Sequence, residues 1–163
     1  ELASYSKVST APLGLPNASQ IEKAATQARQ DLLDEINKIS SKTQASKQAT
    51  MVGAYDPVTG KTAIGSSNGA IAADMLHPNT VKYIEDKLGV KIGEFTDFCK
   101  NKAGACAEVS AADSLVRQGV DPSGIKFTDA VRPRDVWGKD RIPDAAIIPT
   151  CTNCSVTWPR GDL

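Results

Sequence analysis

Apolar residues recur at steps of three and four over the first part of the chain, which is the spacing of one face of an α-helix. This stripe consists of Ile21, Ala25, Ala28, Leu32, Ile36 and Ile39. Ser19 and Glu22 have the spacing of a capping box, so we expect the helix to begin at Ser19 and to end near residue 41. Residues 1–18 are polar and rich in turn formers, and we interpret them as a linker or leader.

Two short apolar runs surround a turn in the next part of the chain. They cover residues 49–55 and 62–66, and Asp56, Pro57 and Gly60 lie between them. Aspartate, proline and glycine favour tight turns, so the pattern predicts a β-hairpin.

The second half of the chain alternates between helical and extended patterns. Helices are expected over residues 78–89 and 106–119, each ending at a glycine. A strand over 125–131 and a polar loop over 132–144 follow, and a short apolar run over 145–148 leads towards two cysteines. This order of elements predicts an α/β sandwich, with one sheet and helices packed on it.

The composition is that of one ordinary domain. Of the 163 residues, 40% are hydrophobic and only 5% aromatic, which indicates a core of Ala, Val, Ile and Leu. Lysine plus arginine equals aspartate plus glutamate at 19 each, which argues against a broad basic surface for duplex nucleic acid. No apolar run approaches the roughly 20 residues of a membrane span. Because the chain begins at Glu1, we expect a piece of a longer polypeptide or a processed product.

The last third of the chain contains four cysteines, which are Cys99, Cys106, Cys151 and Cys154. An even number permits disulfides, with three possible pairings. A chain of this length buries a core without such bridges, so the clustering favours a local metal or reactive site.

Three of these cysteines and one carboxylate form a candidate zinc centre. Cys106 and Glu108 lie at the start of an expected helix, and Cys151 and Cys154 form a Cys-x-x-Cys pair. Three thiolates leave tetrahedral zinc one open position, which is the catalytic arrangement. The helix N-terminus favours a thiolate at Cys106, and Glu108 is placed to act as general base and then general acid. The alternative is a closed structural site with Cys99 as a fourth ligand.

Cys106-Ala107-Glu108, followed by Cys151-Thr152-Asn153-Cys154, resembles the signature of the zinc-dependent nucleoside and nucleic-acid deaminases. Its Cys-Ala-Glu form, with an Ala-rich helix and a short tail, is similar to the bacterial polymorphic-toxin deaminases of the YwqJ-like kind. The resemblance implies a cytidine deaminase-like fold, a three-layer α/β/α sandwich with a single mixed sheet and a minimal C-terminal part. It implies one domain over residues 19–163 with its catalytic core in 49–158, three cysteine ligands for zinc, and Glu108 as the proton shuttle.

The same resemblance implies a reaction and a setting. The reaction is hydrolytic removal of the exocyclic amine of a nucleobase, above all cytosine in nucleic acid. The setting is the toxin module of a secreted effector, delivered into the cytoplasm of a target cell and blocked by a cognate immunity protein. Two alternatives are a metabolic deaminase of free nucleosides, which the neutral charge permits, and a non-catalytic interaction domain stabilised by zinc.

Four further residues are candidates for substrate contacts. Asn68 follows the expected hairpin and can contact a sugar, or simply form an Asn-Gly turn. His77, the single histidine, can line the pocket or cap the next helix. In the polar loop, Trp137 can stack on a base and Arg134 can bind a phosphate, or both can lie on an ordinary surface. Trp158 is expected to fill the core.

Overall fold

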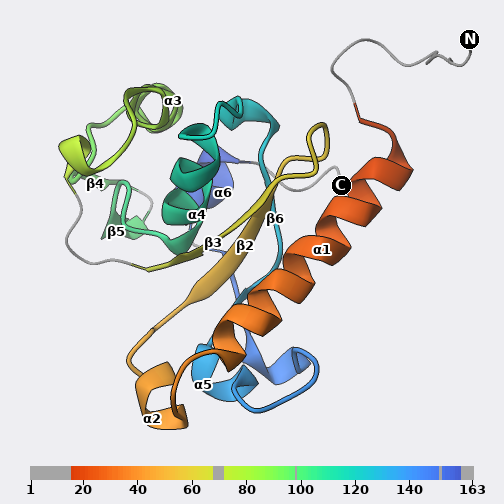
Figure 1. Ribbon diagram of the computed structural model, residues 1–163. Coiled ribbons are helices and arrows are strands. Elements are labelled where there is room, and N and C mark those ends of the chain that lie inside the picture. Colours follow the sequence, from red (N-terminus) through yellow and green to blue (C-terminus); the bar gives the residue numbers. More distant parts are fainter. Residues whose placement is uncertain (1–15, 68–71, 98, 151, 159–163) are drawn as a thin grey trace, which may run out of the picture.

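In the computed structural model, which describes residues 16–67, 72–97, 99–150 and 152–158 without the side chains of 99–101, a β-hairpin forms the centre of the fold (Figure 1). Its strands are β2 (Met51–Tyr55) and β3 (Thr62–Ser66), which pair antiparallel around the predicted turn. Asp56 accepts hydrogen bonds from Thr59 and from the Val58 N–H within this turn. The predicted hairpin is therefore confirmed.

Three short strands extend the sheet beyond β2. They are β6 (Lys126–Phe127), β7 (Ala130–Val131) and β8 (Ile147–Ile148). Strands β6 and β7 both pair with β2, and β8 pairs with β7, so the main path is β3-β2-β7-β8. Every described pairing is antiparallel, which corrects the prediction of a mixed sheet: the molecule is an α/β protein with an antiparallel sheet flanked by helices.

The strand expected over residues 125–131 is interrupted at its centre. The Thr128 hydroxyl accepts a hydrogen bond from the Gly53 N–H at 3.0 Å, while the Thr128 N–H donates to the Gly53 carbonyl at 2.8 Å. A side chain thus takes the place of one main-chain acceptor in the ladder. The local break separates β6 from β7 and leaves the two backbones joined.

Helix α1 (Ala18–Asn37) covers one face of the hairpin (Figure 1). Of the predicted apolar stripe it buries Ala28, Leu32 and Ile36, while Ile21 and Ala25 are partly buried. The helix ends at Asn37 and not near residue 41, so Ile39 lies beyond it. The predicted start at Ser19 is wrong by two residues, because Asn17 is the N-cap. The Asn17 side chain accepts from the Gln20 N–H at 2.8 Å, and the Gln20 side chain accepts from the Asn17 N–H at 2.9 Å, which forms a reciprocal capping box.

Three helices occupy the opposite face of the sheet. They are α3 (Pro78–Leu88), α4 (Ala107–Val116) and α6 (Thr152–Thr157). Helix α4 lies directly on β2 and β3, and α3 packs against both α4 and α6. The predicted helices over 78–89 and 106–119 are confirmed, and Gly89 ends α3 in the left-handed conformation at φ 73°.

Strand β2 is buried along its whole length because helices cover both of its faces. Its residues alternate between two apolar clusters: Val52 and Ala54 pack with α4, whereas Met51 packs with α1. Trp158 fills the α4 side as predicted, since it is 5% exposed and its indole N–H donates to the Pro122 carbonyl at 2.9 Å.

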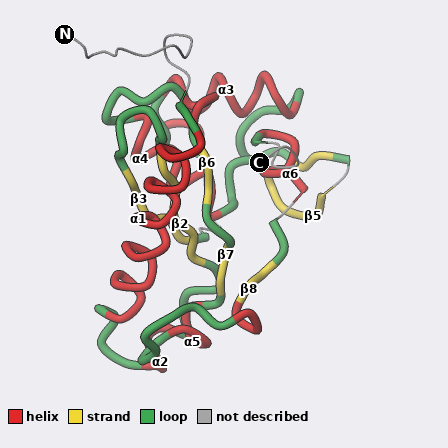
Figure 2. Tube along the Cα trace, turned by 90° about the vertical axis from the view of Figure 1, so that its right-hand side faces the viewer, coloured by secondary structure: helices red, strands yellow, loops and turns green. Residues whose placement is uncertain are grey.

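A second, two-stranded sheet precedes α4 and was not predicted. It consists of β4 (Phe95–Thr96) and β5 (Cys99–Lys102), with Phe95 opposite Lys102. Figure 2 shows β5 beside α6. The base of this hairpin is closed by hydrogen bonds from the Gly93 N–H to the Ala103 carbonyl and from the Ala103 N–H to the Glu94 carbonyl.

Short helices lie at the far end of α1. They are α2 (Lys42–Ala45) and α5 (Pro133–Val136). Elsewhere, the described part of the chain forms three single 3₁₀ turns, at Ala73–Met75, Pro122–Gly124 and Asp144–Ala146. Asn37 donates to the Lys139 carbonyl and accepts from the Gly138 N–H, which ties the end of α1 to the segment after α5. Among the described helices, none combines the length and the apolar character needed to cross a lipid bilayer.

Candidate functional site

The first turn of α4 carries the predicted Cys106 and Glu108 pair. Cys106 is the N-cap residue, with extended φ and ψ of −74° and 154°, and Glu108 lies in the first turn. Both are buried, at 9% and 3% exposure. The positive end of the helix dipole stabilises an anion at this place, which offsets part of the cost of burying a carboxylate. The predicted local arrangement of these two residues is confirmed.

Gly65 on β3 fixes the position of this turn. A Cβ at Gly65 would lie 2.5 Å from the Ala107 carbonyl oxygen and closer still to Ala111 N. Backbone atoms cannot move aside as a flexible side chain can, so only glycine allows α4 to lie this close to the sheet. Ala107 lies between Cys106 and Glu108 in the chain. The close approach at Gly65 therefore sets the position of the helix turn that carries both candidate residues. A glycine in a strand signals a close approach, but the sequence does not say of which element.

Cys154 reaches the same region from α6. It is 2% exposed, is present as a thiol and belongs to the apolar cluster that contains Cys106. Its neighbour Asn153 is also buried, and the Asn153 side-chain oxygen accepts from the Thr96 hydroxyl at 2.7 Å. Helix α6 is thereby held to the β4–β5 hairpin on one side of α4. The structure thus brings Cys106 and Cys154 into one cluster.

Cys106 is disulfide-bonded. Its partner is not among the described side chains. Cys151 lies outside the described residues, and so does the side chain of Cys99, which the sequence offered as a fourth ligand. A disulfide sulfur is no thiolate, so Cys106 in this form does not present the donor that zinc requires. The disulfide alternative is therefore realised at Cys106.

Within the described part of the chain, no three histidine, cysteine, aspartate or glutamate side chains are grouped so as to hold a metal ion. The predicted zinc ligands include Cys151, which lies outside the described residues. The predicted set of three cysteines is therefore not tested by this result.

The structure describes three of the four candidate substrate residues, and it places them on separate segments of the chain. Asn68 lies outside the described residues. Arg134 is exposed on α5, 3.8 Å from Asp135 Oδ1. The Trp137 ring packs against the apolar cluster on the α1 side, and its indole N–H donates to the Ile39 carbonyl at 2.8 Å. In this position Trp137 serves packing between segments, rather than offering a free ring face at the start of α4.

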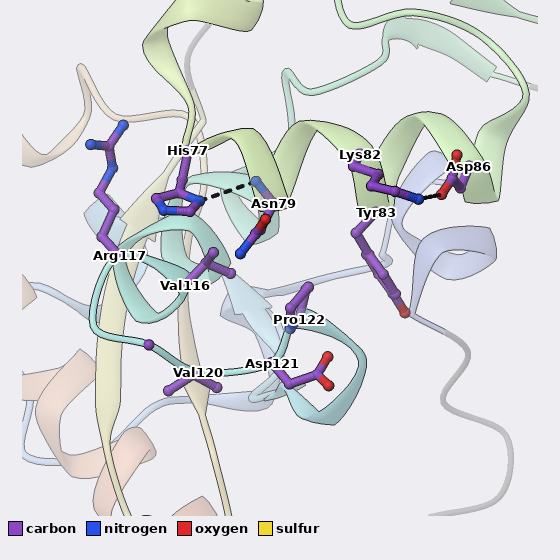
Figure 3. A pocket seen from close by; sticks show the side chains of 11 residues that line it. His77, Asn79, Lys82, Tyr83, Asp86, Val116, Arg117, Val120, Asp121 and Pro122 are labelled. Carbon is purple, nitrogen blue, oxygen red and sulfur yellow. Dashed lines mark hydrogen bonds and ion pairs between the residues drawn. The ribbon is translucent and has the colours of Figure 1, made fainter.

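His77 caps α3, as the structural alternative for this residue predicted. Its ring Nδ1 atom accepts from the Asn79 N–H at 3.0 Å, and its main-chain N–H donates to Asp113 Oδ1 at 2.8 Å. His77 also borders a cavity of about 570 Å³ between α3 and the segment after α4 (Figure 3). Val116 and Arg117 line this cavity, so it lies at the C-terminal end of α4, about 15 Å along the helix from Cys106.

The cavity is lined by apolar and charged side chains, and its lysine and arginine already form ion pairs. Figure 3 shows Lys82 joined to Asp86, an ion pair of 2.8 Å on the outer turn of α3. Tyr83 lies on the same helix and its hydroxyl donates to the Thr157 carbonyl at 2.9 Å. Burial, and then the charge of Asp121, raise the pKa of the Tyr83 hydroxyl above its usual range.

Asp113 is a second buried acid of α4, which the sequence did not single out. It is 7% exposed, accepts from the His77 N–H, and forms an ion pair with Arg117 Nε at 2.7 Å. Arg117 also donates to the Met75 carbonyl at 3.0 Å. These contacts join α4 to the start of α3 and give Asp113 a structural role. The spacing of Asp113 and Arg117, four residues apart, is the signal that could have revealed the pair.

No protein-family model matches the chain, and comparison with curated proteins and with solved structures yields no match either. The candidate chemistry rests on the residues of this chain themselves.

Proposed function

We propose that this protein is a zinc-dependent hydrolytic deaminase that acts on cytosine in nucleic acid. The observation that carries the proposal is Glu108, a carboxylate that is 3% exposed in the first turn of α4, two residues after a cysteine. Cys154 lies in the same apolar cluster as that cysteine. A buried acid at a helix start, close to sulfur donors, supports a role in proton transfer.

Cys106, Cys151 and Cys154 would hold the zinc ion as three thiolates. They fit this role only in the reduced protein, because Cys106 is disulfide-bonded in the structure. A zinc ion held there would supply Lewis acidity and lower the pKa of a water molecule. We therefore expect reduction of the disulfide to precede activity.

Glu108 would move one proton between two positions. Its carboxylate takes a proton from the attacking water and then donates it to the exocyclic nitrogen of cytosine. The carbon–nitrogen bond breaks, a carbonyl forms at the same carbon, and ammonia leaves, so that cytosine and water become uracil and ammonia. Burial of Glu108 keeps bulk water away from this transfer.

The reaction is tested by following uracil and ammonia from cytidine, single-stranded DNA, duplex DNA and RNA. We expect the reduced, zinc-loaded protein to deaminate at least one of them, and Glu108→Gln to lower the rate about 100- to 10,000-fold. Ser110→Ala, an exposed change on the same helix, is the matched control and should leave the rate unchanged. No product from any substrate, or equal rates for wild type and Glu108→Gln, contradicts the proposal.

The metal requirement has a test of its own that does not depend on activity. We expect the reduced protein to bind one zinc ion per chain and the oxidised protein to bind none, with thiols counted in parallel. Cys154→Ser should lose most of the zinc from the reduced protein, since it removes one of the three donors. Equal zinc content in the oxidised and reduced proteins would show that the Cys106 thiolate is not a ligand.

The proposed setting, as the toxin module of a secreted bacterial effector with a cognate immunity protein, is supported by the resemblance alone. Sequencing nucleic acids from cells that express wild type or Glu108→Gln tests it. An excess of C-to-T changes in the wild type alone is expected. Equal harm to cells from both proteins, with no such changes, would favour the non-catalytic interaction domain.

A further inference from the structure

The β4–β5 hairpin presents an exposed aromatic ring next to the candidate site. Phe95 is 60% exposed, and in the described part of the chain it is the one aromatic residue among the exposed large hydrophobic side chains. The Lys102 ammonium lies 5.8 Å from the centre of its ring, and the two residues are direct cross-strand partners. The hairpin thus places an aromatic ring that is open to solvent directly beside a cation.

The hairpin is bonded to α6 and leads directly into the start of α4. At its base, Ala103 is fully buried in the cluster that contains Cys106, and it lies three residues before Cys106 in the chain. At its other end, the Thr96 hydroxyl donates to the buried Asn153, the residue before Cys154. Phe95 therefore lies on a hairpin that contacts α6 through Thr96 and joins α4 through Ala103.

We propose that Phe95 and Lys102 form a binding site for single-stranded nucleic acid, which rests on the proposed function because it names the form of that substrate. The ring would stack on an unpaired base, and the ammonium beside it would contact a phosphate. Stacking on aromatic side chains requires an exposed base face, which a duplex conceals. Because the chain has no net charge, a local site that combines stacking with one cation would bind a single strand without relying on an overall positive charge.

Two acidic residues of the same hairpin limit the electrostatic attraction. Asp97 is exposed in the turn, and the Glu94 side chain accepts from the Lys91 N–H at 2.9 Å. Stacking on Phe95 should therefore contribute more to binding than Lys102 does. The site would favour single strands of any sequence over duplexes, with a modest dependence on salt.

Binding of fluorescein-labelled oligodeoxythymidine of about 12 nucleotides, followed by anisotropy on the full chain, tests the site. Phe95→Ala should weaken binding about 10-fold or more, and Phe95→Trp should restore it. Lys102→Gln should reduce the slope of log affinity against log salt by about 0.7, the value for one phosphate contact on a single strand. Val58→Ala, which alters an exposed hydrophobic residue in the β2–β3 turn, should change nothing.

The outcomes separate this site from the proposed reaction. If Phe95→Ala binds like wild type, or if a duplex of the same length binds as tightly as the single strand, the site is overturned whether or not the protein deaminates. If the protein has no deaminase activity but Phe95→Ala still loses oligonucleotide binding, the site stands and the reaction fails.

Discussion

Helices α1 and α4 pack on opposite faces of the same hairpin, yet they bury their residues differently. Helix α1 buries five of its 20 residues and leaves most of the others exposed, whereas α4 buries eight of its ten. All five buried residues of α1 are apolar, while α4 buries two acids, Glu108 and Asp113. In a helix that buries most of its residues a buried charge is costly, so each buried acid points to a particular role.

The two acids of α4 have separate roles at its two ends. Asp113 lies near the C-terminal end and is bound by His77 and Arg117, which connects α4 to α3. Glu108 lies in the first turn, where the helix dipole favours an anion and where Cys106 is adjacent. The comparison with α1 thus separates a structural carboxylate from the candidate for chemistry.

The largest expected effect on stability concerns the two glycines of β2 and β3 at which the sheet comes closest to the helices. At Gly53, on the α1 side, a Cβ would lie 3.0 Å from the Ala28 carbonyl oxygen and 3.1 Å from Thr128 Cγ2. The clash at Gly65, against the α4 backbone, is much more severe. We expect Gly65→Ala to lower the free energy of unfolding by about 3 kcal/mol or more, and Gly53→Ala by about 1 kcal/mol, in urea titrations. Equal losses would mean that α4 is no more tightly seated than α1.

A smaller effect is expected from the carboxylates that tie each helix to its neighbours. Asp113→Ala removes a buried charge that is bound to Arg117 and to a main-chain N–H, and should cost about 2–3 kcal/mol. On α1, Asp31 is half-exposed and accepts from the neutral groups of Thr62 and Gln27, so Asp31→Ala should cost about 1 kcal/mol. Thermal and urea unfolding measure both. A larger loss for Asp31→Ala would reverse the comparison.

The smallest effect concerns Tyr83, which packs beside Trp158 on the α4 side. Because folding raises the pKa of its hydroxyl, the stability it contributes is fully present below the ordinary tyrosine pKa of about 10. This stability is lost as the pH rises through the higher pKa of the folded state. The stability advantage of wild type over Tyr83→Phe should therefore shrink above pH about 10, as urea unfolding at several pH values would reveal. An advantage that grew with pH would contradict the assignment.

Local patterns predicted the elements whose signals are local. The period of α1, the turn residues of the hairpin, and the Pro78 and Gly89 limits of α3 all appear in the structure. The start of α1 was misplaced because Ser19 and Asn17 each precede a suitable partner by three residues, and the sequence does not say which of them caps the helix. The β4–β5 hairpin was missed because its strands are short and carry no alternation of apolar and polar residues.

The candidate site was predictable only where it follows the chain. A cysteine and a glutamate at a helix start were placed correctly, because a helix N-terminus is a local feature. The direction of the strands, the close approach at Gly65 and the joining of Asp113 to His77 depend on residues far apart in sequence. The disulfide at Cys106 belongs to the same class, since spacing alone leaves three pairings open.

The hydrogen bonds between the end of α1 and the segment after α5 can form only late in synthesis, because their partners lie far apart in the sequence. Asn37 reaches Lys139, and Trp137 reaches Ile39, across separations of 102 and 98 residues. At about 5–20 residues per second, a ribosome makes α1 roughly 5–20 s before the segment that receives it. During that interval the apolar stripe of α1 has no native neighbour from β7 or α5 to cover it. The β2–β3 hairpin is made soon after α1 and can pack on it first, so only the contacts of α1 with the segment around α5 must wait for the end of the chain.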